Sequence, residues 1–506
     1  MEEKNKRIIL YELKIETFFD SNGSGYGDFN GLLLKKYYFQ YLGINLIAIP
    51  DILNQYQNKF ELEAIKNRYG SLSDFIECIN EFRKDKIEIA PIINIGNIKQ
   101  AYINWNNMYD LYNLGKDNNA KKHLTALDTY LVNESQSKIT LDELSNFIQY
   151  LNKIISFYNQ LKVKTIILTN YEFLLKNNNL SEANQFRFLQ DVYKIIKRQN
   201  VDMQVILKSS DVNKEVYSKM LQVTEPCFDY LYLNHLPIMN LNQESKFAKM
   251  QPLPFANFFH AYRPFLNDKR VILSLGSDQV GRINSRWGDE LAYAQEATKT
   301  FLMFVFAAHN SIGIYYGDEL GMLRAKIKKD YQFENDNFNE EKRFYQAKNI
   351  SEDEFFKAQL FQNKITSYTY MSWNNNHYAG ATKAHHGNFL MPEKWQKFNV
   401  EKESNTESSS LKFANLLLKL VFGSEYSETI ENSSISFKFN DKGIAKIIHK
   451  NPENKTIIFL MNLSKNHLFA NVNGSYRILA TTYTNKFYAT VPKQLAPFES
   501  LILIED

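Results

Sequence analysis

Oxygen-bearing side chains alternate along a glycine-rich stretch near the N-terminus, FFDSNGSGYGDFNG (18–31). The alternating oxygens belong to Asp20, Asn22, Ser24, the backbone carbonyl of Tyr26, and Asp28. Hard divalent cations prefer oxygen cages of this kind. The same spacing also suits a solvent loop built from Asx turns. The sequence therefore predicts either a site for Ca²⁺ or Mg²⁺ or a plain surface loop, and it leaves both readings open.

Eight short apolar runs recur along the chain, separated by segments with helical periodicity. Runs that are apolar on both faces are typical of buried parallel strands. The eight runs cover residues 7–13, 45–50, 87–94, 163–169, 203–208, 229–234, 271–275 and 312–316. Eight strand-then-helix units predict an α/β fold, the (β/α)8 or TIM barrel, in which functional side chains gather at the carboxyl ends of the strands.

Several segments do not fit a plain barrel, and they divide the chain. We assign residues 1–94 and 140–425 to the barrel, with a charged helical insert at 323–372 after the eighth strand. Residues 95–139, after the third strand, are polar and aromatic and predict a small inserted domain. In the remaining residues, 426–506, the period changes to two and six short strands alternate with turn residues, which predicts a C-terminal antiparallel β-sandwich.

Composition limits the kind of partner and the compartment. The chain has 506 residues with 60 basic and 56 acidic side chains, too balanced for a general nucleic-acid binder. Two cysteines provide no disulfide framework, and the charged start resembles no signal peptide. The longest apolar run, 301–308, is far shorter than the ~20 residues that span a bilayer. We expect a cytoplasmic protein without a membrane span or a nucleic-acid ligand.

Five motifs spread over nearly the whole chain are specific enough to compare with known families. They are YELKIETFFDSNGSGYGDFNG with LGINLIAIPDI, SDQVGRINSRWGDE, IGIYYGDELGM, ITSYTYMSWNNNHYAGAT and LAPFESLIL. Together they resemble the α-amylase superfamily, family 13 of the glycoside hydrolases, in its oligo-1,6-glucosidase and dextran glucosidase branch. The resemblance implies a barrel with a short domain B at 95–139, a helical insert after strand 8 and a C-terminal sandwich. It also implies a cation in the 20–28 loop, weakened here because Ser24 replaces an acidic ligand.

The catalytic positions of that family are where this chain departs from it. A retaining glycosidase needs two carboxyl groups about 5–5.5 Å apart, one as nucleophile and one as acid/base. By the resemblance, the nucleophile position at the end of the fourth strand holds Thr169, and the position of its arginine partner holds Ile167. The acid/base position at the end of the fifth strand holds Lys208. A third carboxylate is retained as Asp278, although Ser277 replaces the histidine before it.

Positions that hold sugar hydroxyls in the family have changed in a similar way. The third-strand motif ends here in Asn94 and Ile95, of which only the asparagine matches the family. In the loop after the second strand, Asn58 replaces an aspartate, and further on Tyr368 replaces an arginine. The resemblance therefore implies that the barrel mouth, at the carboxyl ends of the strands, binds sugars weakly or not at all.

Two expectations about the altered mouth follow. Lys208 and Asp278 both project into the mouth in this fold, and we predict an ion pair between them that neutralises a carboxylate otherwise left alone. Glu172 and Asp211 each lie three residues beyond a lost catalytic position, a distance of roughly 10 Å in extended chain. That is too far for a retaining pair, whereas an inverting pair at about 6.5–9.5 Å stays open.

The leading interpretation is a pseudoenzyme: an oligo-1,6-glucosidase-like chain that keeps the fold, lacks the reaction, and serves binding, scaffolding or regulation. The alternative is an active α-glucosidase or transglycosylase on small α-glucosides, with a rearranged site around Asp278. A third interpretation is a partner subunit that binds another protein through its surface, which requires exposed aromatic side chains gathered in a patch. Any carbohydrate ligand is expected to bind weakly.

Overall fold

The computed structural model describes residues 7–53, 67–96, 141–171, 181–209, 214–234, 263–329, 331, 333, 338–440, 442–483 and 490–505. Every structural statement below concerns these residues. Nearly all of the predicted domain B, together with Asn58, Glu172 and Asp211, lies outside them.

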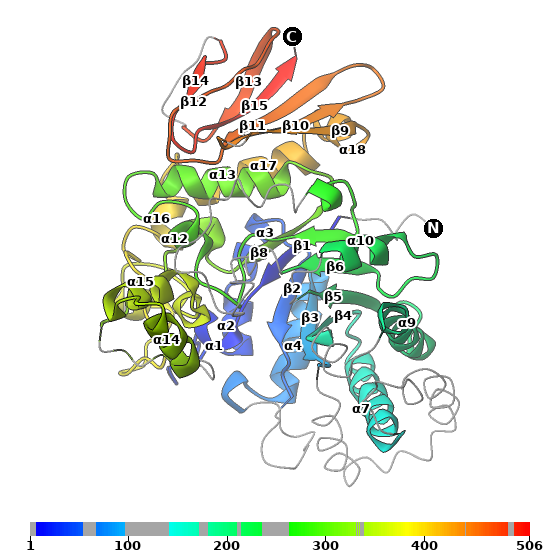
Figure 1. Cartoon of the computed structure of the whole chain (residues 1–506). Coiled ribbons are helices and arrows are strands. Elements are labelled where there is room, and N and C mark those ends of the chain that lie inside the picture. Colours follow the sequence, from blue (N-terminus) through cyan, green and yellow to red (C-terminus); the bar gives the residue numbers. More distant parts are fainter. Residues whose placement is uncertain are drawn as a thin grey trace.

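Eight parallel strands close into a barrel, in which each strand pairs with the next and β8 pairs with β1 (Figure 1). The strands are β1 (Ile9–Glu12), β2 (Leu46–Pro50), β3 (Glu88–Asn94), β4 (Thr165–Thr169), β5 (Gln204–Lys208), β6 (Tyr230–Leu233), β7 (Val271–Leu273) and β8 (Ser311–Tyr315). All eight coincide with the apolar runs of the sequence, so the barrel prediction is confirmed.

Helices form the outer layer of the barrel (Figure 1). Those before β8 are α1 (Ile15–Phe18), α2 (Phe29–Leu34), α3 (Lys36–Tyr41), α4 (Leu72–Lys84), α7 (Leu141–Gln160), α9 (Glu182–Gln199), α10 (Lys214–Gln222), α12 (Ile283–Arg286) and α13 (Ala294–Phe306). Short 3₁₀ turns are η2 (Asn67–Tyr69), η5 (Arg263–Phe265), η6 (Asp318–Leu320), η7 (Lys364–Ser367) and η8 (His377–Gly380). Amphipathic helices among them bury one apolar face; α9, for example, buries Phe188, Val192 and Ile196, whereas every residue of α12 is buried.

Further helices follow β8. Two of them, α14 (Phe338–Ala347) and α15 (Glu352–Gln362), fall inside residues 323–372, where a helical insert was expected. A capping box between Ser351 and Glu354 defines the start of α15. The chain continues through α16 (Val400–Ser404), α17 (Ser410–Phe422) and α18 (Ser427–Glu431).

The C-terminal residues form two antiparallel sheets of unequal size. The larger sheet has the order β13-β15-β11-β10-β9, and the smaller pairs β12 with β14. Their bounds are β9 (Ser434–Phe439), β10 (Ile444–Lys450), β11 (Thr456–Asn462), β12 (Leu468–Phe469), β13 (Tyr476–Thr481), β14 (Gln494–Leu495) and β15 (Ser500–Glu505). Leu495 packs with Leu460 and Leu501 in one apolar cluster, so the small sheet covers one face of the large one. The two-residue strands β12 and β14 were not predicted, and the predicted strand at 487–491 falls mostly outside the described residues.

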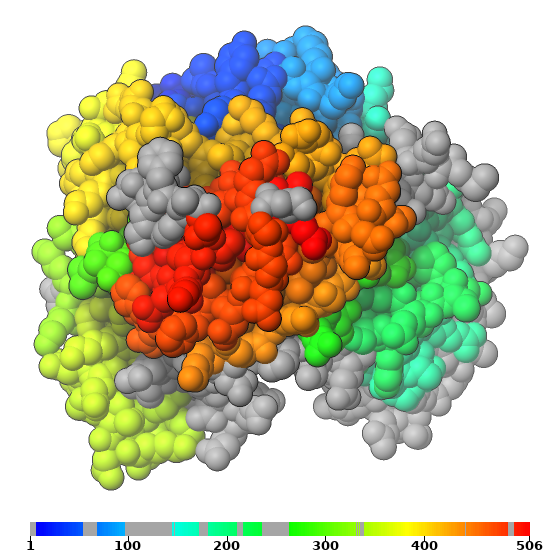
Figure 2. All heavy atoms as spheres, turned by 90° about the horizontal axis from the view of Figure 1, so that it is seen from above, coloured from blue at the N-terminus to red at the C-terminus, as the bar shows by residue number. Residues whose placement is uncertain are grey.

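The C-terminal sheet rests on helices α13 and α17, which separate it from the barrel (Figure 1). A buried hydrogen bond from the Thr300 hydroxyl to the Phe498 carbonyl, 2.6 Å long, ties α13 to this domain. Seen from above, the sheet covers the centre of one face of the molecule (Figure 2). The blue N-terminal residues lie along one edge of the molecule (Figure 2). A search of the described helices for a segment long and apolar enough to cross a membrane finds none.

Alternating side chains fill the interior of the barrel. Leu10, Ile167 and Ile206 belong to one buried apolar cluster inside the strands. Because side chains of a strand alternate between its two faces, the residues two positions further on also face the barrel axis. At the carboxyl ends of β1, β4 and β5, these residues are polar or charged: Glu12, Thr169 and Lys208. The apolar filling therefore gives way to a polar layer at the mouth.

Candidate functional site

The predicted catalytic positions meet in one layer of the barrel mouth. In the strand register Asn94 of β3 pairs with Thr169 of β4, Thr169 pairs with Lys208 of β5, and Lys208 pairs with Tyr232 of β6. Strand pairing thus places the nucleophile and acid/base positions side by side, as the resemblance implied. In this layer, a hydroxyl and an ammonium occupy the two positions to which the resemblance assigns carboxyl groups.

Lys208 is the centre of a buried ion network. Its Nζ lies 2.5 Å from Glu12 Oε1 and 3.1 Å from Asp278 Oδ1. The exposed fraction is 3% for the Lys208 side chain and 0% for that of Glu12, so water does not screen this attraction. The predicted ion pair between Lys208 and Asp278 is confirmed.

A second ammonium completes the pairing of Asp278. Lys14 Nζ lies 2.9 Å from Asp278 Oδ2, so each carboxylate oxygen of Asp278 faces a lysine. Burial alone would raise the pKa of Asp278, but the two ammonium groups outweigh it and hold that pKa well below its usual range. Burial alone would lower the pKa of Lys14, yet attraction to Asp278 and then to Glu12 raises it above its ordinary value. Asp278 is therefore an ionised, fully paired carboxylate.

Three members of this network were not predicted from the sequence: Glu12, Lys14 and Tyr232. The Tyr232 hydroxyl donates to Glu12 Oε2 at 2.8 Å, so both oxygens of Glu12 are bonded. One signal could have found Glu12, because it follows Leu10 on the inward face of an otherwise apolar strand. A charged residue at the last inward position of a barrel strand faces the mouth.

The remaining predicted positions on β3, β4 and β7 serve local structure. Ile167, at the position to which the resemblance assigns an arginine, is fully buried in the barrel interior. The Ser277 hydroxyl accepts from the backbone N–H of Gln279 at 3.0 Å and is shielded from solvent. Asn94 Oδ1 accepts from the Gly96 N–H at 2.9 Å, and the side chain of Ile95 is buried.

Tyr368 belongs to a second polar cluster near the mouth. Its hydroxyl donates to Glu16 Oε1 at 2.7 Å, and the Tyr69 hydroxyl donates to Glu16 Oε2 at 2.8 Å. Burial alone would raise the pKa of Glu16, but these hydrogen bonds outweigh it and lower the pKa. The position that carries an arginine in the family here holds a tyrosine bonded to a buried carboxylate.

The 20–28 loop is organised around its two carboxylates. Asp20 accepts from the backbone N–H groups of Gly23 and Gly25 at 2.8 and 2.7 Å, and from the Thr382 hydroxyl at 2.6 Å. Asp28 accepts from the Gly31 N–H at 2.6 Å. Ser24 Oγ and the Tyr26 carbonyl lie 3.2 Å apart. These are all hard oxygen donors, so the set fits a divalent cation, with only two acidic ligands to attract it.

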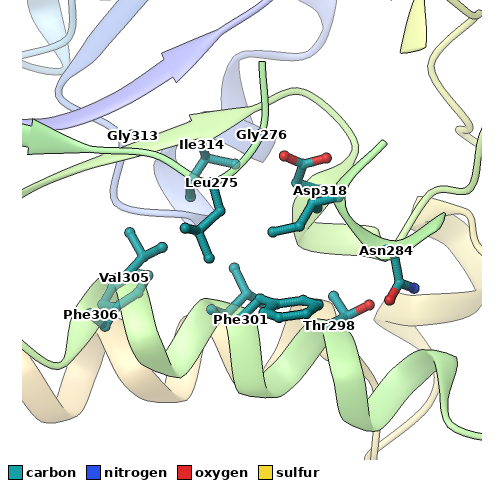
Figure 3. Close-up of a pocket in the computed structure, with 12 residues that line it drawn as sticks. Leu275, Gly276, Asn284, Thr298, Phe301, Val305, Phe306, Gly313, Ile314 and Asp318 are labelled. Atoms are coloured by element: carbon teal, nitrogen blue, oxygen red, sulfur yellow. The ribbon is translucent and has the colours of Figure 1, made fainter. Parts of the chain in front are cut away.

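A small cavity lies behind the mouth, between α13 and the ends of β7 and β8 (Figure 3). Apolar side chains such as Leu275 and Val305 line one end, and Asp318 stands at the other (Figure 3). Burial raises the pKa of Asp318 to about 7, although Arg282 Nη1 lies 3.4 Å away. With about 30 Å³ of open space, the cavity holds about one water molecule and no sugar.

Comparison with known proteins finds similarity both to a family model and to whole relatives. Residues 172–421 match the family model of the alpha-amylase catalytic domain. This segment, just under half of the chain, is therefore similar to an alpha-amylase catalytic domain. It is 22% identical to the oligo-1,6-glucosidase of Heyndrickxia coagulans, with 99% of each chain covered. It is 20% identical to the trehalose-6-phosphate hydrolase of Escherichia coli (strain K12), with 97% of each chain covered.

Solved structures give the same fold for this chain. The isomaltulose synthase of Klebsiella sp. LX3 superposes with a TM-score of 0.78 at 15% identity, over 100% of this chain and 99% of that one. The trehalose-6-phosphate hydrolase of Bacillus licheniformis superposes with a TM-score of 0.77 at 15% identity, over 99% of both chains. At such identities the likeness establishes the barrel and the C-terminal sheet domain.

Proposed function

We propose that this chain is a non-catalytic, oligo-1,6-glucosidase-like member of its family, with a binding, scaffolding or regulatory role. The observation that carries the proposal is the position of the Lys208 ammonium, 2.5 Å from Glu12 and 3.1 Å from Asp278. The position where the family has its proton donor holds a lysine, and its ammonium is paired with two carboxylates. With 3% of its side chain exposed, it is out of reach of a glycosidic oxygen.

Thr169 supports the same proposal from the nucleophile side. A hydroxyl attacks a sugar carbon only when a neighbouring base removes its proton. The neighbours of Thr169 in the strand register are Asn94 and Lys208, neither of which is a carboxylate. In another hydrolase, removal of the catalytic residues cost on the order of 10⁶ in rate. Loss of both carboxyl groups here favours a chain without hydrolytic turnover.

One observation favours the alternative, an active glucosidase or transglycosylase around Asp278. Glu12 and Asp278 both contact Lys208, so their nearest oxygens cannot be farther apart than the sum of the two contact distances. That limit is close to the about 5–5.5 Å between the carboxyl groups of a retaining pair. Against it, Glu12 is fully buried and both of its oxygens are bonded, one to Lys208 and one to Tyr232. The alternative therefore requires Lys208 to move out of the mouth.

A hydrolysis assay separates the two functions. The purified chain is incubated with isomaltose, maltose, sucrose, trehalose 6-phosphate and a nitrophenyl α-glucoside, and released sugar is measured. We expect no release above the buffer blank. Hydrolysis that disappears in both Asp278→Asn and Glu12→Gln would reject the proposal and establish the alternative. Hydrolysis that persists unchanged in both variants comes from a contaminating glycosidase, so the variants serve as the control.

Two further expectations belong to the proposal. A divalent cation in the 20–28 loop would be structural, held by the oxygens of Asp20, Asn22, Ser24, Tyr26 and Asp28.

We also place the protein in the cytoplasm, because Cys78 and Cys227 are both free and buried, as expected where thiols stay reduced. Fractionation of source cells followed by immunodetection tests the location, and recovery in the medium or with the membranes would contradict it.

A further inference from the structure

An open groove lies at the amino end of the barrel, opposite the mouth. Its volume of about 870 Å³ is within the about 300–1,000 Å³ typical of small-molecule sites. The starts of β1, β2 and β3 form one wall, and α17 and α18 form the other. From above, the blue N-terminal region and the amber α17–α18 region that supply these walls lie side by side (Figure 2).

A buried guanidinium lies in the wall of this groove. Arg7 is 6% exposed and donates from Nε to the Asn310 carbonyl at 2.9 Å and from Nη2 to the Ala308 carbonyl at 2.8 Å. Its Nη1 has no hydrogen-bond acceptor within the part of the chain that the structure describes. Burial lowers the pKa of Arg7 to about 10, with attraction to Glu431 acting in the opposite direction. The groove wall thus carries a positive charge whose hydrogen-bonding capacity is incompletely used.

Other charges of the groove favour an anion as its ligand. Two of the three lining carboxylates already have lysine partners outside the groove: Asp85 lies 2.8 Å from Lys36, and Glu431 is paired with Lys269. Glu428 is the third. In contrast, Lys86 and Lys419 line opposite walls, and neither has a carboxylate partner among the described residues.

The groove also offers an apolar surface to a ligand. Phe422 is 37% exposed and packs one ring face against the Arg7 guanidinium, whose carbon lies 4.6 Å from the ring centroid. Leu418 and Val421, on the same helix, line the groove beside it. An arginine stacked on an aromatic ring is held in place with little loss of its ability to bind phosphate or carboxylate oxygens.

We propose that this groove binds a small organic anion, a phosphate monoester or a carboxylate attached to an apolar or ring-bearing body. The anionic group would lie between Lys86 and Lys419, in the field of Arg7, and the body would lie against Phe422. The proposal uses none of the residues of the mouth, so it stands whether or not the chain hydrolyses glycosides.

Calorimetric titration tests the proposal with glucose 6-phosphate, citrate, inorganic phosphate and uncharged glucose as probes. We expect saturable binding of at least one organic anion, no binding of glucose, and weaker binding at higher salt. The double variant Lys86→Ala/Lys419→Ala should weaken binding at least tenfold. Glu428→Gln should tighten it about twofold, because it removes a negative charge that has no lysine or arginine partner among the described residues.

A matched control uses Lys412→Ala, on the same helix as Lys419, whose ammonium is already paired with Glu407 at 2.5 Å. This variant should bind as the unaltered chain does. Arg7 is left unchanged because it holds two backbone carbonyls of the barrel. Absence of saturable binding by every probe, or binding that the double variant and the Lys412 variant alter equally, would overturn the proposal.

Discussion

The two ends of the barrel differ in how their charged side chains are paired. At the mouth, Glu12 and Asp278 alternate with Lys14 and Lys208 in direct contact, and the ammonium at the centre is almost completely buried. At the amino end, by contrast, an open groove of about 870 Å³ retains cations without carboxylate partners in the described structure. A buried charge must be paired to be tolerated, whereas a charge at an open groove is solvated and free to meet a ligand.

This contrast indicates where binding capacity lies in an altered enzyme fold. A working glycosidase keeps two carboxyl groups accessible to the substrate and to water at its active site. Here lysines supply the counter-charge from within the chain, so the mouth contains ion pairs. Since pairing a buried charge often does no more than offset its desolvation, the network is weak evidence for a gain in stability. Removal of one partner of a buried ion pair is costly, however, so substitutions in the network test the comparison.

The largest effect is expected when the mouth network loses its central cation. Lys208→Met keeps the apolar volume but leaves Glu12 fully buried beside Asp278 without the ammonium between them. We expect a loss of about 3–5 kcal/mol in the free energy of unfolding, measured by urea titration.

The matched control for this variant is Lys219→Met, which breaks an exposed pair with Glu182 at 2.7 Å and should cost less than about 1 kcal/mol. Adding Glu12→Gln to Lys208→Met should recover part of the loss, because it removes the buried charge left without an ammonium partner, whereas Asp278 keeps Lys14. Equal costs for the two lysine variants would mean that the mouth does not depend on its ion pairs.

An intermediate effect is expected near the amino end, where the barrel meets the C-terminal sheet. His449 is buried, and its Nε2 lies 2.7 Å from the Ala307 carbonyl. Burial lowers the pKa of His449 to about 4 from its ordinary 6.5, outweighing the opposite effect of the hydrogen bond to Ala307. A depressed histidine pKa favours the neutral form in the folded state. Its contribution to stability is complete above pH 6.5 and is lost as the pH falls toward 4.

We expect that contribution to reach at most about 3 kcal/mol. Urea titrations from pH 7.5 to 4.5 should show a shallower loss of stability for His449→Gln than for the unaltered chain. His467→Gln, which changes an exposed histidine, should follow the unaltered chain throughout. If the His449 and His467 variants have the same slope, the junction is not sensitive to acid through His449.

The smallest effect on stability is expected from Ca²⁺ binding to the 20–28 loop, whose acidic oxygen donors belong to Asp20 and Asp28. If Ca²⁺ binds the folded chain and not the unfolded chain, a Ca²⁺ concentration ten times the dissociation constant adds about 1.4 kcal/mol to the free energy of unfolding. Thermal unfolding in millimolar Ca²⁺ should therefore have a higher midpoint than unfolding in EDTA. Ser24→Asp should increase the difference because it adds a third acidic ligand. Identical midpoints with Ca²⁺ and EDTA, for both the unaltered chain and Ser24→Asp, would assign the loop to structure without a cation.

Much of the fold was predictable because it depends on local pattern. Runs apolar on both faces specify buried parallel strands, and all eight were located within one or two residues of their bounds. Two strands of the C-terminal domain, β12 and β14, were missed because each is only two residues long and has no periodicity to detect. The pairing of Lys208 with Asp278 was also predictable, since the family resemblance aligned both with strand ends at the mouth.

Neither the rest of the network nor the groove could be read from the chain. The amino-acid sequence alone determined that charged residues end several apolar strands, and the family resemblance predicts Thr169 and Lys208 at the positions of two carboxyl groups. Only closure of the barrel decided that Glu12 meets a lysine 196 positions away. Strand alternation specifies which face a side chain takes, but which ends lie close together depends on register and closure. These are properties of the whole barrel, and they turned separate charges into a paired network.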